Sequence, residues 1–213
     1  MQTNKNNLSP RTYKRLVVYY KKLIQLKGQG AEHVSSVQLA KQCELNPSVV
    51  KKDLSVILSE EGKPRVGHEI NKLIEDIEKS LDYTTDKKAI IIGVGNLGKA
   101  LLNYRGFEDY GLQIIAGFDC LDATVSLGEI AGKPIYHVND LQKMVKKLNV
   151  KIAILTTPGE VAQEVAQKLI NCGILAIWNF TSAHVIAPKN IAIRQENMAA
   201  SLAILSNQLK QLL

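Results

Sequence analysis

Residues 89–102 read Ala-Ile-Ile-Ile-Gly-Val-Gly-Asn-Leu-Gly-Lys-Ala-Leu-Leu, and residues 114–119 continue the same unit as Ile-Ile-Ala-Gly-Phe-Asp. The first four residues are apolar and mostly β-branched, which is typical of a buried parallel strand. Three glycines then follow in the spacing G-x-G-x-x-G, and the apolar residues after them recur at helical intervals. Because the glycines stand where a strand turns into a helix, this stretch predicts a dinucleotide-binding unit.

Each glycine of this turn has a separate predicted task. Gly93 allows the tight turn out of the strand, Gly95 lets a pyrophosphate approach the backbone, and Gly98 lets the helix pack close to the strand. Asn96 and Leu97 open the helix, whose first N–H groups and partial positive charge attract phosphate. We therefore assign these five residues to the predicted cofactor site.

An acidic residue completes the pattern. The second apolar run, residues 112–118, ends in Asp119, which lies 21 residues beyond Gly98. A carboxylate at this point accepts a hydrogen bond from a ribose 2′-OH and repels a 2′-phosphate, so the predicted cofactor is NAD(H). Two alternatives stay open: glycines kept for packing alone, or another phosphate ligand such as coenzyme A.

Strands and helices alternate along this region, which predicts an α/β Rossmann domain with a mostly parallel, doubly wound sheet. Ligands of such sheets bind at the carboxyl ends of the strands. Further apolar runs at 150–155 and 174–178 end in polar or aromatic residues, so the predicted cofactor site also takes in Thr156, Thr157, Pro158, Asn179 and Phe180. The alternative for the threonines and Asn179 is turn chemistry and helix capping.

The net charge of +7 is concentrated in the N-terminal third. Residues 1–72 contain 13 Lys and Arg against 6 Asp and Glu, whereas residues 73–213 contain 14 of each kind. Such an asymmetry indicates a polyanionic partner for the N-terminal part, and the alternative is a basic surface that is only solvated.

Composition narrows the class of protein. No apolar run reaches the ~18 residues that a membrane-spanning helix needs. The N-terminus lacks an apolar signal core, so we expect a cytoplasmic protein. The three cysteines are far apart and have no metal-ligand spacing, so we expect reduced thiols and no metal site.

Three short helices are predicted in the basic third. The first covers residues 10–27 and starts at Ser9-Pro10; the second is capped by Ser35-Ser36, with Val37, Leu39 and Ala40 turned inward; the third covers residues 47–58. A tight turn joins the last two, which is the helix-turn-helix pattern.

Polar residues on the third helix and after it are the predicted DNA contacts. Residues 60–68 contain two glycines and a proline and are predicted to form a hairpin, which adds a wing to the helix-turn-helix. Hydroxyl and cationic side chains suit phosphates and base edges, so the predicted contacts are Ser48, Lys51, Lys52, Ser55, Lys63 and Arg65. The alternative is a small helical domain with a solvated lysine face.

The C-terminal tail forms a third predicted segment. Residues 196–213 carry a wide apolar helical face, while the sheet already has its own helices, so we expect this helix to pack on a partner chain. Folding back on its own domain is the alternative. The predicted organisation is a winged-helix domain at 1–83, a Rossmann domain at 84–194 and a dimerisation helix at 195–213.

Taken together, the chain resembles the Rex family of bacterial redox-sensing transcriptional repressors over nearly its whole length. The resemblance implies a homodimer with swapped C-terminal helices, which NADH releases from twofold-symmetric DNA operators and NAD⁺ leaves bound. The matching pieces are Arg15-Leu16, Tyr19-Tyr20, Ser35-Ser36, residues 51–55 (Lys-Lys-Asp-Leu-Ser), residues 93–98, Phe118-Asp119, residues 134–136 (Pro-Ile-Tyr), residues 154–158 (Ile-Leu-Thr-Thr-Pro), residues 163–166 (Gln-Glu-Val-Ala) and Asn179-Phe180.

The resemblance also implies a switch. In the family, an Asp at the start of the last helix pairs with an Arg of the first helix in the DNA-bound form and with a Tyr after the phosphate-binding helix in the NADH form. The matching positions are Asn197, Lys21 and Tyr104, so both ends of the ionic contact differ from the family pattern. A weaker response to NADH is therefore expected.

The main alternative function is an NAD-dependent oxidoreductase with an accessory N-terminal domain. Such an enzyme needs a positioned acid or base and a substrate pocket. Of the four histidines, only His137 and His184 belong to the α/β part, and only a helix follows the predicted Rossmann unit. We therefore predict a protein that is not an enzyme.

Overall fold

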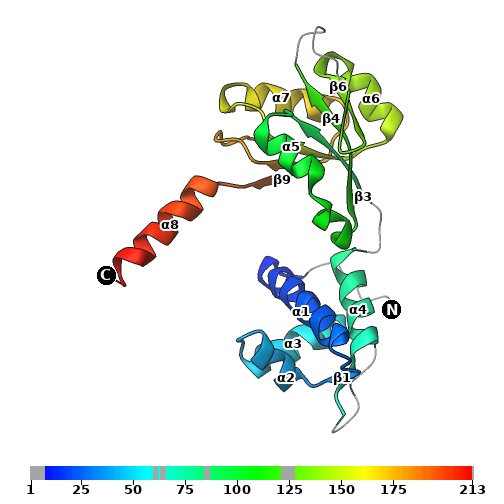
Figure 1. The fold of residues 1–213 in the computed structure, drawn as a ribbon, viewed down its shortest axis with the longest axis vertical. Coiled ribbons are helices and arrows are strands. Elements are labelled where there is room, and N and C mark those ends of the chain that lie inside the picture. Colours follow the sequence, from blue (N-terminus) through cyan, green and yellow to red (C-terminus); the bar gives the residue numbers. More distant parts are fainter. Residues whose placement is uncertain (1–7, 60–61, 63–65, 84–86, 121–127, 213) are drawn as a thin grey trace. The chain divides into compact units, whose positions relative to one another are not determined.

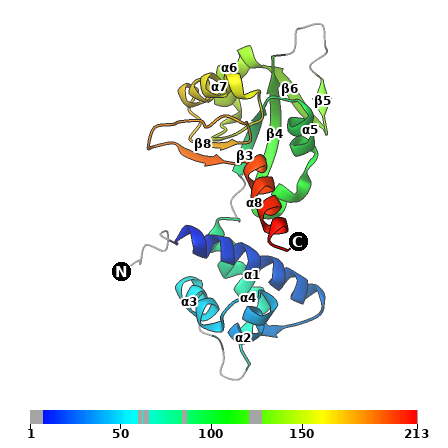
Figure 2. The same ribbon diagram turned by 90° about the vertical axis from the view of Figure 1, so that its left-hand side faces the viewer.

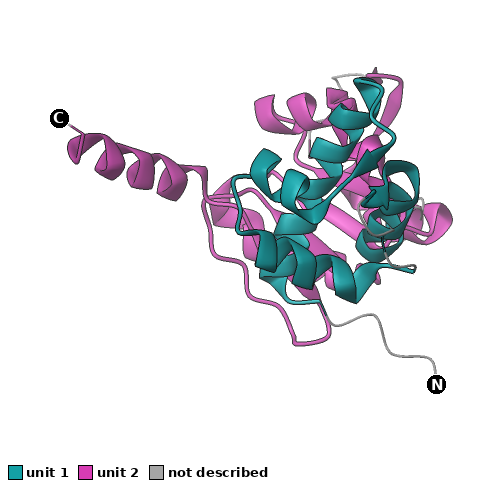
Figure 3. Cartoon of the chain, turned by 90° about the horizontal axis from the view of Figure 1, so that it is seen from below, with its two compact units in different colours: residues 1–85 teal, residues 86–213 magenta. Residues whose placement is uncertain are grey.

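The computed structural model describes residues 8–59, 62, 66–83, 87–120 and 128–212. The chain divides into two compact units, Met1–Thr85 and Asp86–Leu213, coloured separately in Figure 3. The second unit begins close to this boundary, because Lys87 and Lys88 already pair with the neighbouring strand of its sheet.

Unit 1 is mainly helical (Figure 1). Its elements in chain order are α1 (Pro10–Gly28), β1 (His33–Val34), α2 (Ser36–Gln42), α3 (Pro47–Ile57), β2 (His68–Glu69) and α4 (Ile70–Leu81). Helices α1 and α2 begin where their capping residues predicted: the Ser9 hydroxyl accepts from the Thr12 N–H, and Ser35 forms a capping box with Gln38. Asn46 caps α3 in the same way.

The three predicted helices and α4 bury one apolar core, which includes Leu16, Tyr19 and Leu23 of α1. The predicted inward orientation of Val37 is wrong, because its side chain is 63% exposed while Leu39 is fully buried. Two residues two positions apart on a helix are separated by about 200° around its axis, so they face opposite sides.

The segment predicted as a wing is described only in part. Lys63 and Arg65 lie outside the described residues. At the described end of this segment, β2 pairs antiparallel with β1. Gly67 has a φ of +94°, and a Cβ there would come within 2.6 Å of the Val34 carbonyl oxygen, so this close approach requires glycine.

Unit 2 is an α/β domain (Figures 1 and 2). Its elements are β3 (Lys87–Ile92), α5 (Asn96–Asn103), the 3-10 helix η1 (Arg105–Tyr110), β4 (Leu112–Asp119), β5 (Glu129–Ile130), β6 (Lys133–His137), the 3-10 helix η2 (Val138–Asp140), α6 (Leu141–Leu148), β7 (Ile152–Leu155), α7 (Gly159–Asn171), β8 (Ala176–Asn179), β9 (Ala192–Gln195) and α8 (Met198–Lys210).

In the described part of unit 2, seven strands form one sheet in the order β5-β6-β4-β3-β7-β8-β9. All neighbouring pairs are parallel except β5 with β6, which form an antiparallel hairpin at one edge. The predicted doubly wound sheet is therefore confirmed. Strand β9 was not predicted from the sequence; it pairs with β8 and extends the sheet at the other edge.

Alternate residues of β3 belong to different cores. Ile90 and Ile92 pack in the cluster that contains the inner residues of α6 and α7. Ala89 and Ile91 pack on the other side with Leu102 of α5. The period-2 alternation of a strand covered on both faces explains why this run is apolar throughout.

Helix α8 differs from the other helices of unit 2, because all 13 of its residues are exposed. Figure 1 shows it projecting from β9 rather than lying on a face of the sheet. Within the described part of the chain, no helix has the length and apolar character needed to cross a membrane.

Candidate functional site

The central strand β3 marks the point where the order of strands reverses. Its neighbours are β4 on one side and β7 on the other: the chain continues from β3 to β4 and β6 on one side, and then crosses back to β7, β8 and β9 on the other. Parallel sheets of this kind bind ligands in the crevice at such a point. At the carboxyl ends of these strands, Gly93 directly follows β3, Asp119 is the last residue of β4, and Thr156 directly follows β7.

The turn after β3 is held by the end of β7. Gly93 has a φ of +92°, and a Cβ there would come within 2.8 Å of the Thr156 backbone. The Thr156 hydroxyl donates to the Gly93 carbonyl oxygen at 2.6 Å. A Cβ on Gly98 would collide with that same carbonyl oxygen. The geometry agrees with the predicted tasks of Gly93 in the turn and of Gly98 in helix packing.

Gly95 faces open space. A Cβ built on Gly95 meets nothing within 4 Å, so the glycine is not needed for packing inside the chain. Gly95 is also the N-cap of α5, which receives no side-chain capping bond, and the next residues, Asn96 and Leu97, are exposed and half-buried. The backbone amides that begin α5 are thus accessible to an anionic group.

Asp119 lies beside this turn. Its Oδ2 accepts from the Val94 N–H at 2.6 Å and its Oδ1 from the Cys120 N–H at 2.7 Å. The carboxylate is thereby oriented, and each oxygen keeps a lone pair that can accept a further bond from a hydroxyl group.

The neighbouring Thr157 has an unmet hydrogen bond. Among the described residues, its hydroxyl is the one buried side-chain polar atom with no hydrogen-bond partner. Leaving such a group unpaired costs about 1–3 kcal/mol. A ligand bound next to the Gly-rich turn would supply a partner, so the residues present fit a dinucleotide. Pro158 follows as the exposed N-cap of α7.

Asn179, by contrast, is occupied by contacts within the protein. Its side-chain N–H group donates to the Ala183 carbonyl oxygen at 2.8 Å and to the Gln195 side chain at 2.6 Å, and its oxygen accepts from the Thr181 N–H. The residue is 1% exposed. The observed contacts of Asn179 are those of turn chemistry, and they join β8 to β9.

Four aromatic side chains, which come from the region after α5 and from the end of β8, pack in a row that the sequence did not predict. Phe180 packs on Trp178 with ring centroids 4.7 Å apart, Trp178 on Phe107 at 5.6 Å, and Phe107 on Tyr104 at 4.8 Å. The Trp178 indole N–H also donates to Glu196, just before α8. Local periodicity gives no signal for contacts between residues about 70 positions apart.

The predicted DNA-contact residues of α3 gather on one side of the helix. Its outer face carries exposed Ser48, Lys51, Lys52 and Ser55, and its inner face carries buried Val50, Leu54 and Ile57. Both hydroxyl groups have local partners, because Ser48 donates to the Asn46 side chain and Ser55 to the Lys52 carbonyl oxygen.

An open groove of about 1040 Å³ borders this face. Its lining includes Lys51 and Ser55 together with Ser36 of α2 and His68 of β2, which the sequence did not single out. The Ser36 hydroxyl and the His68 Nε2 are 3.5 Å apart, and burial lowers the pKa of His68. The groove therefore combines hydroxyl groups with a lysine, which suits a phosphate backbone.

The three residues matched to the switch lie in different elements. Lys21 is exposed on α1 of unit 1, and Tyr104 directly follows α5 of unit 2 with 55% of its surface exposed. Asn197 is the N-cap of α8, and its side-chain oxygen accepts from the Ala200 N–H at 2.9 Å. Within one chain, Asn197 is therefore engaged in starting α8.

Both units match known families. Residues 84–183 match a family model described as a CoA binding domain, and residues 7–55 match one described as the N-terminus of a putative DNA-binding protein.

Solved structures match almost the whole chain. A crystal structure of RSP, a Rex-family repressor, in complex with β-NAD⁺ and operator DNA aligns with a TM-score of 0.89 and 27% identity, covering 96% of this chain and 94% of that chain. The complex of RSP with β-NADH aligns with a TM-score of 0.83 and 27% identity, covering 96% and 95%.

A curated relative is closer in sequence. The redox-sensing transcriptional repressor Rex of Bacteroides thetaiotaomicron is 38% identical over 198 residues, which cover 93% of this chain and 89% of the relative. With this identity over nearly the full length of both chains, the protein belongs to the Rex family of redox-sensing transcriptional repressors.

Proposed function

We propose that this protein is a homodimeric repressor that binds operator DNA through unit 1 and NAD(H) through unit 2, and that NADH releases it from the DNA. One observation carries the proposal: an accessible Gly-rich turn at the strand-order reversal of one unit occurs together with an exposed serine and lysine face on α3 of the other. Binding to operator DNA would take place in the cytoplasm of a bacterium.

In this proposal the turn after β3 binds the pyrophosphate. Gly93, Gly95 and Gly98 shape the turn, Asn96 and Leu97 present the first amides of α5, and the Asp119 carboxylate accepts from a ribose hydroxyl. The support for this arrangement is the open space at Gly95 and the orientation of Asp119 by the Val94 N–H.

The ends of β7 and β8 would form the remainder of the NAD(H) site. Thr157 offers its unpaired hydroxyl, and Pro158 and Phe180 offer apolar surface. Thr156 and Asn179 act indirectly in this scheme, because their side chains already hold the Gly93 turn and the loop after β8.

The proposed DNA surface is the outer face of α3. Ser48, Lys51, Lys52 and Ser55 would contact phosphates and base edges in a major groove, and Lys63 and Arg65 would contact the flanking DNA. A dimer presents this surface twice, so its operator should consist of two matching half-sites. Helix α8 supports the dimer, because its exposed apolar residues need another surface.

Two other functions, an NAD-dependent oxidoreductase and a coenzyme A-binding protein, are less well supported. Against the oxidoreductase, relatives in the family are named as repressors, and an enzyme of this kind would need a substrate pocket with an acid or base beside the nicotinamide. Coenzyme A is named by the family model for residues 84–183, but Asp119 would repel the 3′-phosphorylated ribose of that ligand if the ribose lay there.

The proposed switch should respond weakly. If Asn197 and Lys21 take the places of the family's Asp and Arg, the contact that holds the DNA-bound form is no longer an ion pair. A ligand shifts an equilibrium only by its differential affinity for the two states. We expect NADH to lower operator affinity by about fivefold, the low end of usual allosteric couplings. The combined change Asn197→Asp with Lys21→Arg should enlarge that ratio.

Selection of binding sites from a pool of random duplexes tests the function. Selections run with NAD⁺, with NADH and with coenzyme A should yield one twofold-symmetric motif, enriched most with NAD⁺ and least with NADH. Isotherms on that motif then give the ratio of affinities. Enrichment of no motif in any arm would contradict DNA recognition, and a response to coenzyme A alone would contradict the assignment of NAD(H).

A further inference from the structure

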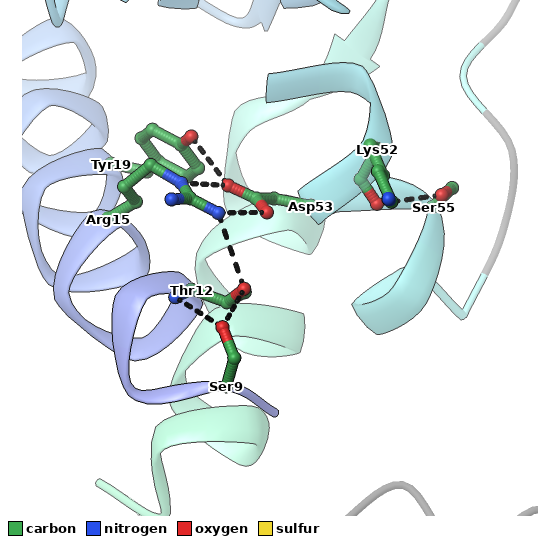
Figure 4. A network of polar contacts seen from close by, with 7 residues as sticks. All are labelled: Ser9, Thr12, Arg15, Tyr19, Lys52, Asp53 and Ser55. Carbon is green, nitrogen blue, oxygen red and sulfur yellow. Dashed lines mark hydrogen bonds and ion pairs between the residues drawn. The ribbon is translucent and has the colours of Figure 1, made fainter. Parts of the chain in front are cut away.

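A partly buried polar network joins α1 to the inner side of α3 (Figure 4). Asp53 of α3 is 4% exposed. Arg15 of α1 donates to both of its carboxylate oxygens, from Nε to Oδ2 at 2.6 Å and from Nη2 to Oδ1 at 2.7 Å, and the Tyr19 hydroxyl donates to Oδ2 at 2.9 Å. The bonds span 38 and 34 positions of sequence, so they are contacts of the tertiary structure.

The arginine is itself held at the start of its helix. Its Nη2 also donates to the Thr12 hydroxyl at 3.3 Å, and Thr12 lies 3.0 Å from the Ser9 hydroxyl that caps α1. Figure 4 shows this chain of contacts running from the first turn of α1 to Asp53. The guanidinium group is thus oriented from both sides.

The carboxylate stays ionised in this setting. Burial by itself would raise the pKa of Asp53, but the hydrogen bonds from Arg15 and Tyr19 outweigh burial and hold the pKa below its usual value. Burial and the bond to Asp53 raise the pKa of Tyr19, so its hydroxyl keeps its proton. All three groups therefore keep their donor and acceptor roles near neutral pH.

The planar two-point contact between Arg15 and Asp53 restricts movements of α3 that apolar packing allows. The contacts of Val50, Leu54 and Ile57 are non-directional, and such packing tolerates small shifts of a helix. A rotation of α3 about its axis, or a slide along it, breaks at least one of the parallel Arg15–Asp53 bonds. Lys51 and Lys52 adjoin Asp53 in sequence, so the network also determines the direction in which the outer face points.

We propose that Arg15 and Tyr19 are positioning residues for operator recognition, which act through Asp53 to set the rotation and axial position of α3. The inference rests on the proposed DNA-binding function and deepens it. Base edges must be met at hydrogen-bond distance, whereas phosphate contacts supply affinity for any sequence. Arg15 and Tyr19 therefore determine the preference for operator over other DNA, and not the affinity for DNA in general.

Substitutions that keep the charge and size of the side chains test this inference. Arg15→Lys retains a cation without the two-point contact, and Tyr19→Phe removes one hydrogen bond. Dissociation constants are measured for the selected operator and for a shuffled duplex of equal length, each over a series of salt concentrations. Arg15→Lys should reduce the operator preference about tenfold, similar to one mismatched base pair, and Tyr19→Phe should reduce it less.

Binding to the shuffled duplex is the readout that separates positioning from direct contact. It should change by less than about twofold in both variants, with the same salt dependence. A similar weakening of affinity for both duplexes would instead mean that Arg15 contacts the DNA backbone directly, and would overturn the proposal. Arg11→Lys is the matched control, because Arg11 is exposed on α1 four positions earlier; its operator preference should not change.

A variant with three apolar side chains in place of the network separates the positioning role from an effect on folding stability. Replacing a buried ion pair by apolar side chains often leaves a protein as stable or more stable. The triple variant Arg15→Met, Tyr19→Phe, Asp53→Leu should therefore unfold at or above the wild-type temperature and bind NADH as before, yet lose operator preference. Full preference in this folded variant would overturn the inference alone. Equal binding of both duplexes by the wild type would overturn the proposed function as well.

Discussion

Helices α3 and α8 are similar in length but differ in what determines their position. Helix α3 has 11 residues and buries Val50, Asp53, Leu54 and Ile57 within its own unit. Helix α8 has 13 residues, all of them exposed, including Leu202 and Leu205 at more than 60%. The position of α3 is determined by its own domain, whereas α8 buries none of its residues against the described part of the chain.

The largest effect is expected from breaking the apolar face of α8. Leu202→Asp with Leu205→Asp should convert a dimer into monomers, because the charges would be buried without partners at the subunit contact. Operator affinity should fall by a hundredfold or more, since simultaneous binding of two half-sites contributes about 10²–10⁴. Sedimentation velocity and operator titration measure the two changes.

Asn207→Asp is the control for this pair, because helical spacing places residue 207 away from the stripe of Leu202, Leu205 and Leu209. It should leave both mass and affinity unchanged. A double variant that remains dimeric would show that α8 does not form the subunit contact.

The outer face of α3 provides the second test. Lys51→Ala with Lys52→Ala should weaken operator binding about tenfold or more, and each lysine–phosphate interaction that is removed should make the slope of log K against log salt shallower by about 0.9. Unfolding should be unaffected because both side chains are exposed. The control is Lys143→Ala with Lys147→Ala on α6 of unit 2, where the slope should not move. An unchanged slope in the α3 variant would mean that another surface binds the DNA.

A third test concerns the ligand edge of the unit that carries α8. Asp119→Ala should weaken NADH binding about tenfold, which corresponds to one hydrogen bond to a charged group, and should narrow the preference for NADH over NADPH. Titration of both nucleotides by fluorescence gives the two constants. The mass of the dimer should stay the same, so ligand binding and α8 docking are separable. Wild-type protein that binds NADPH as tightly as NADH would contradict the role of Asp119.

The smallest expected effect is a loss of folding stability in acid, and it should arise from α3 and not from α8. The pKa of Asp53 is below its unfolded value, so this carboxylate stabilises the folded state above the unfolded pKa, and the contribution is lost as the pH falls through the folded pKa, below about pH 4. Helix α8 contains no acidic residue. The free energy of unfolding is measured with urea for wild type and for Asp53→Asn at several pH values between 7 and 3. Plotted against pH, the two free energies should converge as the pH falls. A constant difference between them would mean that Asp53 does not contribute in this way.

Local features of the chain were predictable from the sequence, because their causes lie within a few residues. Ser9-Pro10, Ser35 and Asn46 start their helices by capping the next backbone amides. The alternation of apolar residues in β3 and the glycines that follow it define strand, turn and helix. The predicted doubly wound sheet followed from that order, since parallel strands joined by helices have few possible arrangements.

The tertiary structure decided which polar side chains meet. Arg15 reaches Asp53 from 38 positions away, and Asn179 is enclosed by the loop after β8 and by β9. The Thr157 hydroxyl is buried with no hydrogen-bond partner among the described residues. Strand β9 is short and depends on pairing with β8, and the local sequence pattern does not predict this pairing. A hydrogen bond is directional and short-ranged, so its partner is determined by the packing of distant segments, whereas periodicity and capping act within one or two turns of the chain.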